Sequence, residues 1–137
     1  MSARIYVPID AAALSVGAER VARAVERLID EGGADVTLVR NGSRGLFWLE
    51  PLVEIETSAG RVAFGPVAPG DVASLFDAKF QPNTKHKLYL GLTEEIPFLK
   101  KQERLTFARC GITDPLSIDD YKAHGGYRGL TRALTMD

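Results

Sequence analysis

The chain has 137 residues, of which 45% are hydrophobic, so it is long enough for one domain with a core and an additional segment. Its 17 Lys and Arg residues against 18 Asp and Glu residues give no electrostatic reason to expect nucleic acid or an anionic membrane as a partner. The single cysteine, Cys110, excludes an internal disulfide framework, and no apolar run approaches the length of a membrane span. A strand-like run follows directly on the N-terminus, so we expect no signal peptide and a soluble, cytoplasmic protein.

The first forty residues have the pattern of a strand, a crossover helix and a second strand. Residues 5–7 are β-branched or aromatic and are predicted to form a short strand that ends at Pro8. Residues 14–28 carry apolar side chains at spacings of three and four, which predicts an amphipathic helix that stops at Gly32-Gly33. Residues 36–39 are predicted as the second strand, and this order requires a parallel pair.

A hairpin and a short helix follow. Residues 52–57 alternate as a half-exposed strand, residues 58–60 turn the chain, and residues 61–64 return as the partner strand. Residues 71–76 place Val72, Leu75 and Phe76 on one side of a short helix. The resulting order β-α-β-β-β-α is that of an α/β, thioredoxin-like domain, which we expect to occupy residues 1–80.

The remaining residues, 81–137, are expected to form a linker and a mostly helical segment that leads into a flavin- and NAD-binding domain absent from this chain. Residues 81–87 are polar, and residues 88–92 could form an extended segment. Helix-like patterns follow at residues 93–104, 117–126 and 127–134.

The loop before the hairpin has a distinctive motif. Residues 40–55 resemble the ligand loop of thioredoxin-like [2Fe-2S] ferredoxins, in which Cys-x-x-x-Cys, two further residues and Gly or Glu-Pro lead into a strand. The two ligand positions are Ser43 and Phe47 here, and the resemblance places the two earlier ligand positions near Pro8 and Ala13. Because Fe–S clusters are held by Cys thiolates, we expect this domain to keep the ferredoxin fold without the cluster.

A second motif lies further along the chain. Residues 101–104, 110–115 and 120–127 resemble the segment that precedes the flavin domain in the flavoprotein subunits of NADH dehydrogenases, NAD-reducing hydrogenases and NAD-dependent formate dehydrogenases. With residues 93–102 included, the chain most resembles the N-terminal part of the beta subunit of soluble NAD-dependent formate dehydrogenase.

That resemblance implies FMN, NAD and a [4Fe-4S] cluster for the full-length subunit. It also implies two partners, a [2Fe-2S] gamma-type subunit and the formate-oxidising alpha-type subunit. No glycine follows Gly129 and Cys110 stands alone, so no catalytic, cofactor-binding or metal-binding residue is carried over to this chain. We therefore expect a scaffolding and docking part that is not catalytic alone. The alternatives are the same part of a hydrogenase or NADH dehydrogenase flavoprotein subunit, and a stand-alone thioredoxin-like interaction module.

Two features of the loop allow more than one interpretation. Asn41-Gly42-Ser43-Arg44-Gly45 could be an anion-binding nest, but we favour a tight loop that needs its glycines for backbone reasons. Phe47-Trp48-Leu49 could anchor a partner subunit, fold back into the space of a cluster, or do both with Phe47 inside and Trp48 outside.

The other reactive side chains are predicted to be structural. Cys110 has no nearby base or resolving cysteine, so a packing role is favoured. His86 and His124 lack the spacing of metal ligands, and His124 is expected to interact with the last carbonyls of its helix. Glu94 and Glu95 are adjacent and are expected to be solvated rather than a catalytic pair.

Overall fold

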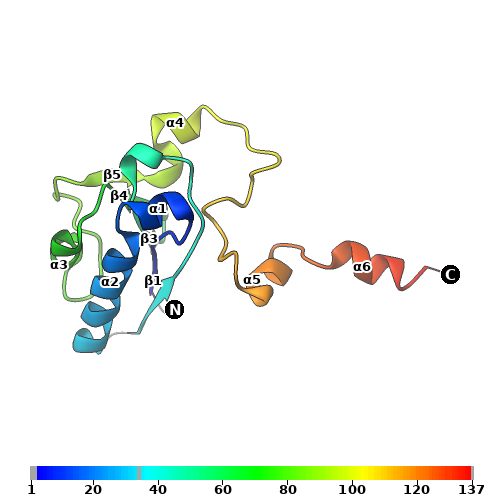
Figure 1. Cartoon of the computed structure of the whole chain (residues 1–137), viewed down its shortest axis with the longest axis horizontal. Coiled ribbons are helices and arrows are strands. Elements are labelled where there is room, and N and C mark those ends of the chain that lie inside the picture. The colour runs from blue at the N-terminus through cyan, green and yellow to red at the C-terminus, as the bar shows by residue number, and fades with distance from the viewer. Residues whose placement is uncertain (1–2, 34, 137) are drawn as a thin grey trace.

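The computed structural model describes residues 3–33 and 35–136, and in it a single five-stranded sheet with the order β2-β1-β3-β4-β5 organises the fold. Figure 1 shows the sheet, the helices beside it and the C-terminal segment that extends away from it. The strands are β1 (Ala3–Tyr6), β2 (Val36–Val39), β3 (Val53–Thr57), β4 (Gly60–Phe64) and β5 (Tyr89–Leu92). β1 and β2 are parallel, and the other neighbouring pairs are antiparallel. The predicted thioredoxin-like α/β class is confirmed.

The predicted first helix is divided into two, α1 (Ala11–Ser15) and α2 (Ala18–Gly32). Asp10 caps α1, because its carboxylate accepts hydrogen bonds from the backbone N–H groups of Ala12 and Ala13. The break falls at Gly17, whose φ of 104° is one that other L residues rarely adopt. The predicted stop is confirmed, since α2 ends at Gly32 with Gly33 in the left-handed conformation.

The sheet has two different faces because alternate residues point to opposite sides. One face carries Ile5, Ile55 and Phe64, which pack in the main core with α2 and with the one-turn helix α3 (Val72–Leu75). The opposite face carries Tyr6, Glu54, Arg61 and Ala63. No long helix of the described residues covers that second face. Instead, it holds a small apolar cluster of Leu46, Leu52, Ala63, Ile96 and Leu99.

β5 places part of the expected linker in the sheet. It pairs with β4, and Leu88, Tyr89 and Leu92 pack against the main core. The extended segment was predicted at residues 88–92, but its place in the sheet was not, because a four-residue strand carries little sequence pattern. Residues 81–87 therefore form a loop that leads from α3 to β5. The division into a thioredoxin-like domain at residues 1–80 and an entry segment of a flavin domain at residues 81–137 stays a prediction.

The C-terminal part is less helical than its sequence suggests. The pattern at residues 93–104 gives only a 3-10 turn at Thr93–Glu95 and the one-turn helix α4 (Pro97–Lys100), because Pro97 starts a new helix. Two short helices follow, α5 (Ile118–Ala123) and α6 (Arg128–Ala133), and α6 extends away from the sheet in Figure 1. Two further 3-10 turns occupy Phe47–Leu49 and Pro69–Asp71. Within the described residues, no helix combines the length and apolar character needed to cross a membrane.

Candidate functional site

The loop between β2 and β3 is closed by its own side chains. The Ser43 hydroxyl donates to Glu50 Oε1 at 2.9 Å and accepts from the N–H of Gly45, also at 2.9 Å. The other oxygen of Glu50 accepts from the N–H of Leu52 at 2.9 Å. Gly45 has a φ of 80°, which explains why glycine stands there. Ser43, at a ligand position of the ferredoxin loop, is thus used to hold the loop together.

The Glu50 carboxyl group is buried at the base of this loop. Burial raises its pKa, and the hydrogen bonds from Leu52 and Ser43 offset only part of that effect. A buried carboxyl group that accepts hydrogen bonds from both ends of the loop is a structural element, and its ionisation should couple to stability.

The four positions that correspond to cluster ligands do not fit an iron–sulfur cluster. Ser43 is engaged in the loop bonds above, and the Phe47 side chain is 62% exposed. Pro8 is buried, and Ala13 is part of the main core. None of these side chains offers a thiolate, which is the group that holds such clusters. Across the described residues, no group of three or more His, Cys, Asp or Glu side chains is placed to hold a metal ion.

A buried charge cluster lies beside the loop on the second face of the sheet. The Arg44 guanidinium donates to both oxygens of Glu54, from Nη2 to Oε1 at 2.8 Å and from Nε to Oε2 at 3.3 Å. Their side chains are only 5% and 1% exposed. Asn41 Nδ2 donates to Glu54 Oε2 at 3.2 Å, and Arg61 Nη1 lies 3.6 Å from the same oxygen. Desolvation lowers the pKa of Arg44, but Glu54 and Glu94 more than offset it, so the net pKa is raised and the guanidinium stays charged.

This cluster argues against the anion-binding interpretation of residues 41–45, because it occupies the Arg44 side chain. Each nitrogen of the Arg44 guanidinium already donates to a carboxylate, because Nη1 also donates to Glu94 at 2.7 Å, so the positive charge is paired within the protein. The positive φ of Gly45 agrees with the tight-loop interpretation. Glu94 is largely exposed, as expected, and it also pairs with the buried Arg44.

Residues 104–112 cross the second face of the sheet and contact the same cluster. Arg104 Nη2 donates to the carbonyl oxygen of Arg44 at 2.6 Å. The carbonyl oxygen of Gly111 accepts from Asn41 at 2.7 Å and from Arg61 at 3.0 Å, and that of Ile112 accepts from Arg61 at 2.8 Å. A segment some sixty residues away in sequence therefore lies on the ferredoxin-type loop.

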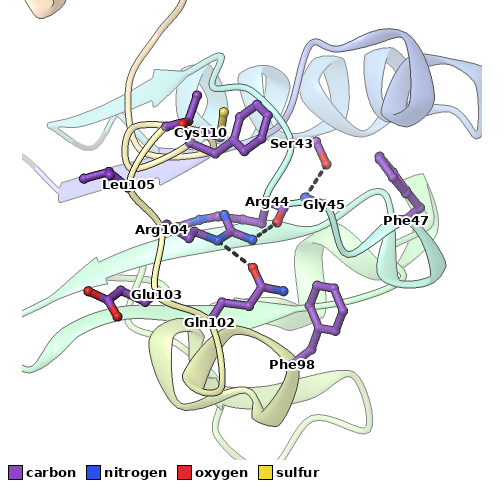
Figure 2. A pocket seen from close by; sticks show the side chains of 12 residues that line it. Ser43, Arg44, Gly45, Phe47, Phe98, Gln102, Glu103, Arg104, Leu105 and Cys110 are labelled. Atoms are coloured by element: carbon purple, nitrogen blue, oxygen red, sulfur yellow. Dashed lines mark hydrogen bonds between the residues drawn. The ribbon is translucent and has the colours of Figure 1, made fainter.

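A pocket of about 710 Å³ opens between the loop and this segment. Figure 2 shows Ser43, Gly45 and Phe47 on one side of it, and Phe98, Gln102, Arg104 and Cys110 on the other, with Arg104 bonded across to the loop. The structure thus brings Cys110 to the same pocket as the two ligand positions Ser43 and Phe47, although sequence gave no reason to connect them. The Cys110 thiol is exposed, so the predicted packing role is wrong.

The aromatic residues of the loop point outward. Phe47 and Trp48 are 62% and 59% exposed, and Trp48 stacks edge-on against Phe98 with ring centroids 5.0 Å apart. Neither ring fills the space of a cluster. The residue that packs inside is Leu46, which is fully buried. Of the interpretations considered for Phe47 and Trp48, only the exposed one agrees with the structure.

Both histidines lie outside this site. His86 contacts the Ser74 hydroxyl at 3.1 Å and accepts from the N–H of Leu88. His124 Nδ1 lies 2.8 Å from the carbonyl oxygen of Asp120, so the predicted interaction with the end of its helix is confirmed.

Sequence reasoning assigned no role in the site to Glu54, Arg61 or Gly111. Glu54 and Arg61 occur in alternating strands, where a charged residue usually points to solvent, and only the remote segment makes them part of a buried cluster. Gly111 has a φ of 76°, and a Cβ there would lie 2.2 Å from Arg44 Cδ. An isolated glycine in a segment without helical pattern was the one signal that could have drawn attention to a close backbone approach.

Comparison with known proteins supports this description of the fold. No family model matches the chain. Among solved structures, a cysteine-to-serine variant of the thioredoxin-like [2Fe-2S] ferredoxin from Aquifex aeolicus superposes with a TM-score of 0.53 at 17% identity. The superposition covers 65% of this chain and 98% of the ferredoxin. At this identity the match shows that the two share a fold, and it says nothing about a shared cofactor.

A short segment of the chain is similar in sequence to a curated protein. Over 37 residues, 27% of this chain, the protein is 57% identical to a protein described as NADP-reducing hydrogenase subunit HndC from Solidesulfovibrio fructosivorans. The matched segment spans only 8% of that hydrogenase subunit.

Proposed function

We propose that this chain is the N-terminal scaffolding and docking part of an NADH-dehydrogenase-like flavoprotein subunit in an NAD(P)-linked redox complex. The observation that carries the proposal is the 57% identity over 37 residues to a subunit of an NADP-reducing hydrogenase. The ferredoxin-type fold, with a loop held by Ser43 and Glu50 in place of thiolates, supports a structural rather than an electron-carrying role for this part.

The finer proposal is the beta subunit of a soluble NAD-dependent formate dehydrogenase. It is supported by the resemblance of residues 93–127 to the segment that precedes the flavin domain in that family. FMN, NAD and the [4Fe-4S] cluster belong to the longer subunit, where formate oxidation is coupled to NAD reduction. We assign none of them to residues of this chain, and the chain is not catalytic alone.

Two other functions each have a specific observation in their favour. The relative matched in sequence is a hydrogenase subunit, which favours the same part of an NAD(P)-reducing hydrogenase, or of an NADH dehydrogenase, as the second candidate. The exposed rings of Phe47, Trp48 and Phe98 favour a stand-alone interaction module, since aromatic side chains dominate the energetics of protein interfaces.

The experiment that separates these functions is reconstitution with defined partners. The chain is co-expressed in turn with the gamma-type and alpha-type subunits of a formate dehydrogenase and with the corresponding hydrogenase subunits, and complexes are measured by size-exclusion chromatography with light scattering. A complex with a formate dehydrogenase subunit supports the finer proposal. A complex formed only with hydrogenase subunits moves the assignment to the second candidate, and no complex with either set contradicts the docking role.

Substitutions then show whether the exposed aromatic rings make the contact. If they do, Trp48→Ala should weaken the complex about 30-fold, because truncating a central interface aromatic costs about 2 kcal/mol or more. Leu14→Ala is the control, since Leu14 is another exposed apolar residue and lies on a different element, α1. Equal effects of the two substitutions would remove the aromatic rings from the docking surface.

A further inference from the structure

Two segments that are far apart in sequence are joined by a set of buried and partly buried polar contacts. One is the ferredoxin-type loop with its neighbouring strands, and the other is the segment 104–112. Four hydrogen bonds connect them: Arg104 to the Arg44 carbonyl, Asn41 to the Gly111 carbonyl, and Arg61 to the carbonyls of Gly111 and Ile112. Three of the four bonds are accepted by backbone carbonyls of the crossing segment, and the fourth is donated by that segment's own Arg104 side chain to a carbonyl of the loop.

The sheet side of this contact is a built site. Glu54 is 1% exposed and lies at its centre, where it contacts Asn41 and Arg61, the two side chains that donate to the carbonyls of the crossing segment. Arg61 is further fixed because its guanidinium lies 3.4 Å from the centroid of the Tyr6 ring. Charged donors held in place by a buried carboxylate make stronger hydrogen bonds than neutral ones do.

The crossing segment fits this site sterically. Gly111 is buried, and a Cβ at that position would come within 2.2 Å of Arg44 Cδ and 2.8 Å of Arg44 Cγ. Only glycine allows the backbone to approach the arginine side chain so closely, and its φ of 76° also favours glycine. Between the two anchor points, Leu105 and Phe107 are exposed, so the segment is held at its ends and not along its middle.

We infer that residues 104–112 form a strap that binds to the loop and to the second face of the sheet, and that this binding fixes the direction in which the C-terminal segment leaves the domain. In Figure 1 the chain swings out after α4, returns to the sheet before α5, and only then extends away with α6. The return point is the Gly111 anchor. The loop that corresponds to the ligand loop of the ferredoxins here binds the strap, through the Arg44 carbonyl. This role does not depend on which redox complex the chain belongs to.

Hydrogen exchange measured by mass spectrometry on the full chain tests the strap. Arg61→Met removes two charge-assisted hydrogen bonds to the strap, and amide exchange in residues 104–116 should become about 10- to 100-fold faster, while exchange in α2 stays unchanged. Arg104→Ala removes the single hydrogen bond from the partly exposed Arg104 side chain to the Arg44 carbonyl. It should speed amide exchange in the strap less than Arg61→Met does. Arg23→Met is the matched control, because Arg23 pairs with Glu19 on exposed helix surface.

Two glycines give a second comparison. Gly111→Ala should also release the strap, whereas Gly33→Ala should not, although both glycines have positive φ, because a Cβ at Gly33 meets no atom within 4 Å. A nitroxide on the native, exposed Cys110 should then become more mobile in the Gly111 variant than in wild type.

Two outcomes would overturn the inference. Fast exchange and a mobile nitroxide already in the wild-type strap would mean that the strap is not bound. Equal acceleration of strap and sheet amides in the Arg61 and Arg104 variants would mean that the segment is an inseparable part of the sheet domain and not a strap on its surface.

Discussion

Removing Arg44 should destabilise the protein far more than removing an exposed arginine. Arg44→Met keeps the apolar stem and deletes the guanidinium, which leaves the Glu54 carboxylate buried with Asn41 and the more distant Arg61. Breaking a buried ion pair by removing one partner costs about 3–5 kcal/mol, and the remaining Arg61 places this case near the lower end. The lost pair with Glu94 adds little, because that carboxylate is largely exposed.

A loss of about 3 kcal/mol is a large share of the total stability of a domain, which is typically about 5–15 kcal/mol. The thermal midpoint should fall by roughly 10 °C, and the urea midpoint should fall in proportion. Circular dichroism of thermal and urea unfolding measures both. Arg23→Met, which deletes an exposed helix pair, should cost less than about 0.5 kcal/mol.

The double variant Arg44→Met with Glu54→Leu isolates the electrostatic part. If the cost of Arg44→Met comes from an unpaired buried carboxylate, then removing that carboxylate as well should restore part of the lost stability. A cost for Arg44→Met no larger than that of Arg23→Met would refute the reasoning. So would a double variant that is less stable than the two single variants combined.

Two further predictions concern pH and proteolysis. Burial raises the pKa of Glu50 in the folded state, so the contribution of Glu50 to stability is favourable below the unfolded pKa and is lost as pH rises through the folded pKa. The free energy of unfolding of Glu50→Gln should therefore rise relative to that of wild type between about pH 4 and pH 7, as measured by urea unfolding. A difference between the two proteins that does not change with pH would contradict this sign. Trypsin should cut first in residues 118–136, where exposed short helices make few buried contacts, and leave residues 3–100 intact on mass spectrometry. A first cut within residues 81–87 would instead place the domain boundary near residue 80.

The elements of the main core could be predicted from local sequence. The apolar spacing of α2 and the alternation of β3 and β4 depend only on nearby residues, and these elements occur where they were expected. The break between α1 and α2 was missed because the apolar period continues through Gly17, and only the backbone conformation of that glycine interrupts it.

The site could be predicted only in part. The motif identified Ser43 and Phe47 as ligand positions without ligands, and the structure shows what the loop does instead. The cluster around Glu54 depends on Gly111, more than fifty residues later in the chain, and no local pattern connects the two. The burial of a charged residue on a strand face can be predicted only when the position of the segment that covers it is known.

Iron–sulfur reconstitution tests most directly whether this ferredoxin fold has lost its electron carrier. The purified chain is incubated anaerobically with ferrous iron and sulfide, desalted, and analysed for iron and by EPR after reduction, with a thioredoxin-like [2Fe-2S] ferredoxin as positive control. We expect background iron and no paramagnetic signal, because Ser43, Phe47, Pro8 and Ala13 supply no thiolate. About two irons per chain with the EPR signal of a reduced [2Fe-2S] cluster would contradict a structural role for the loop.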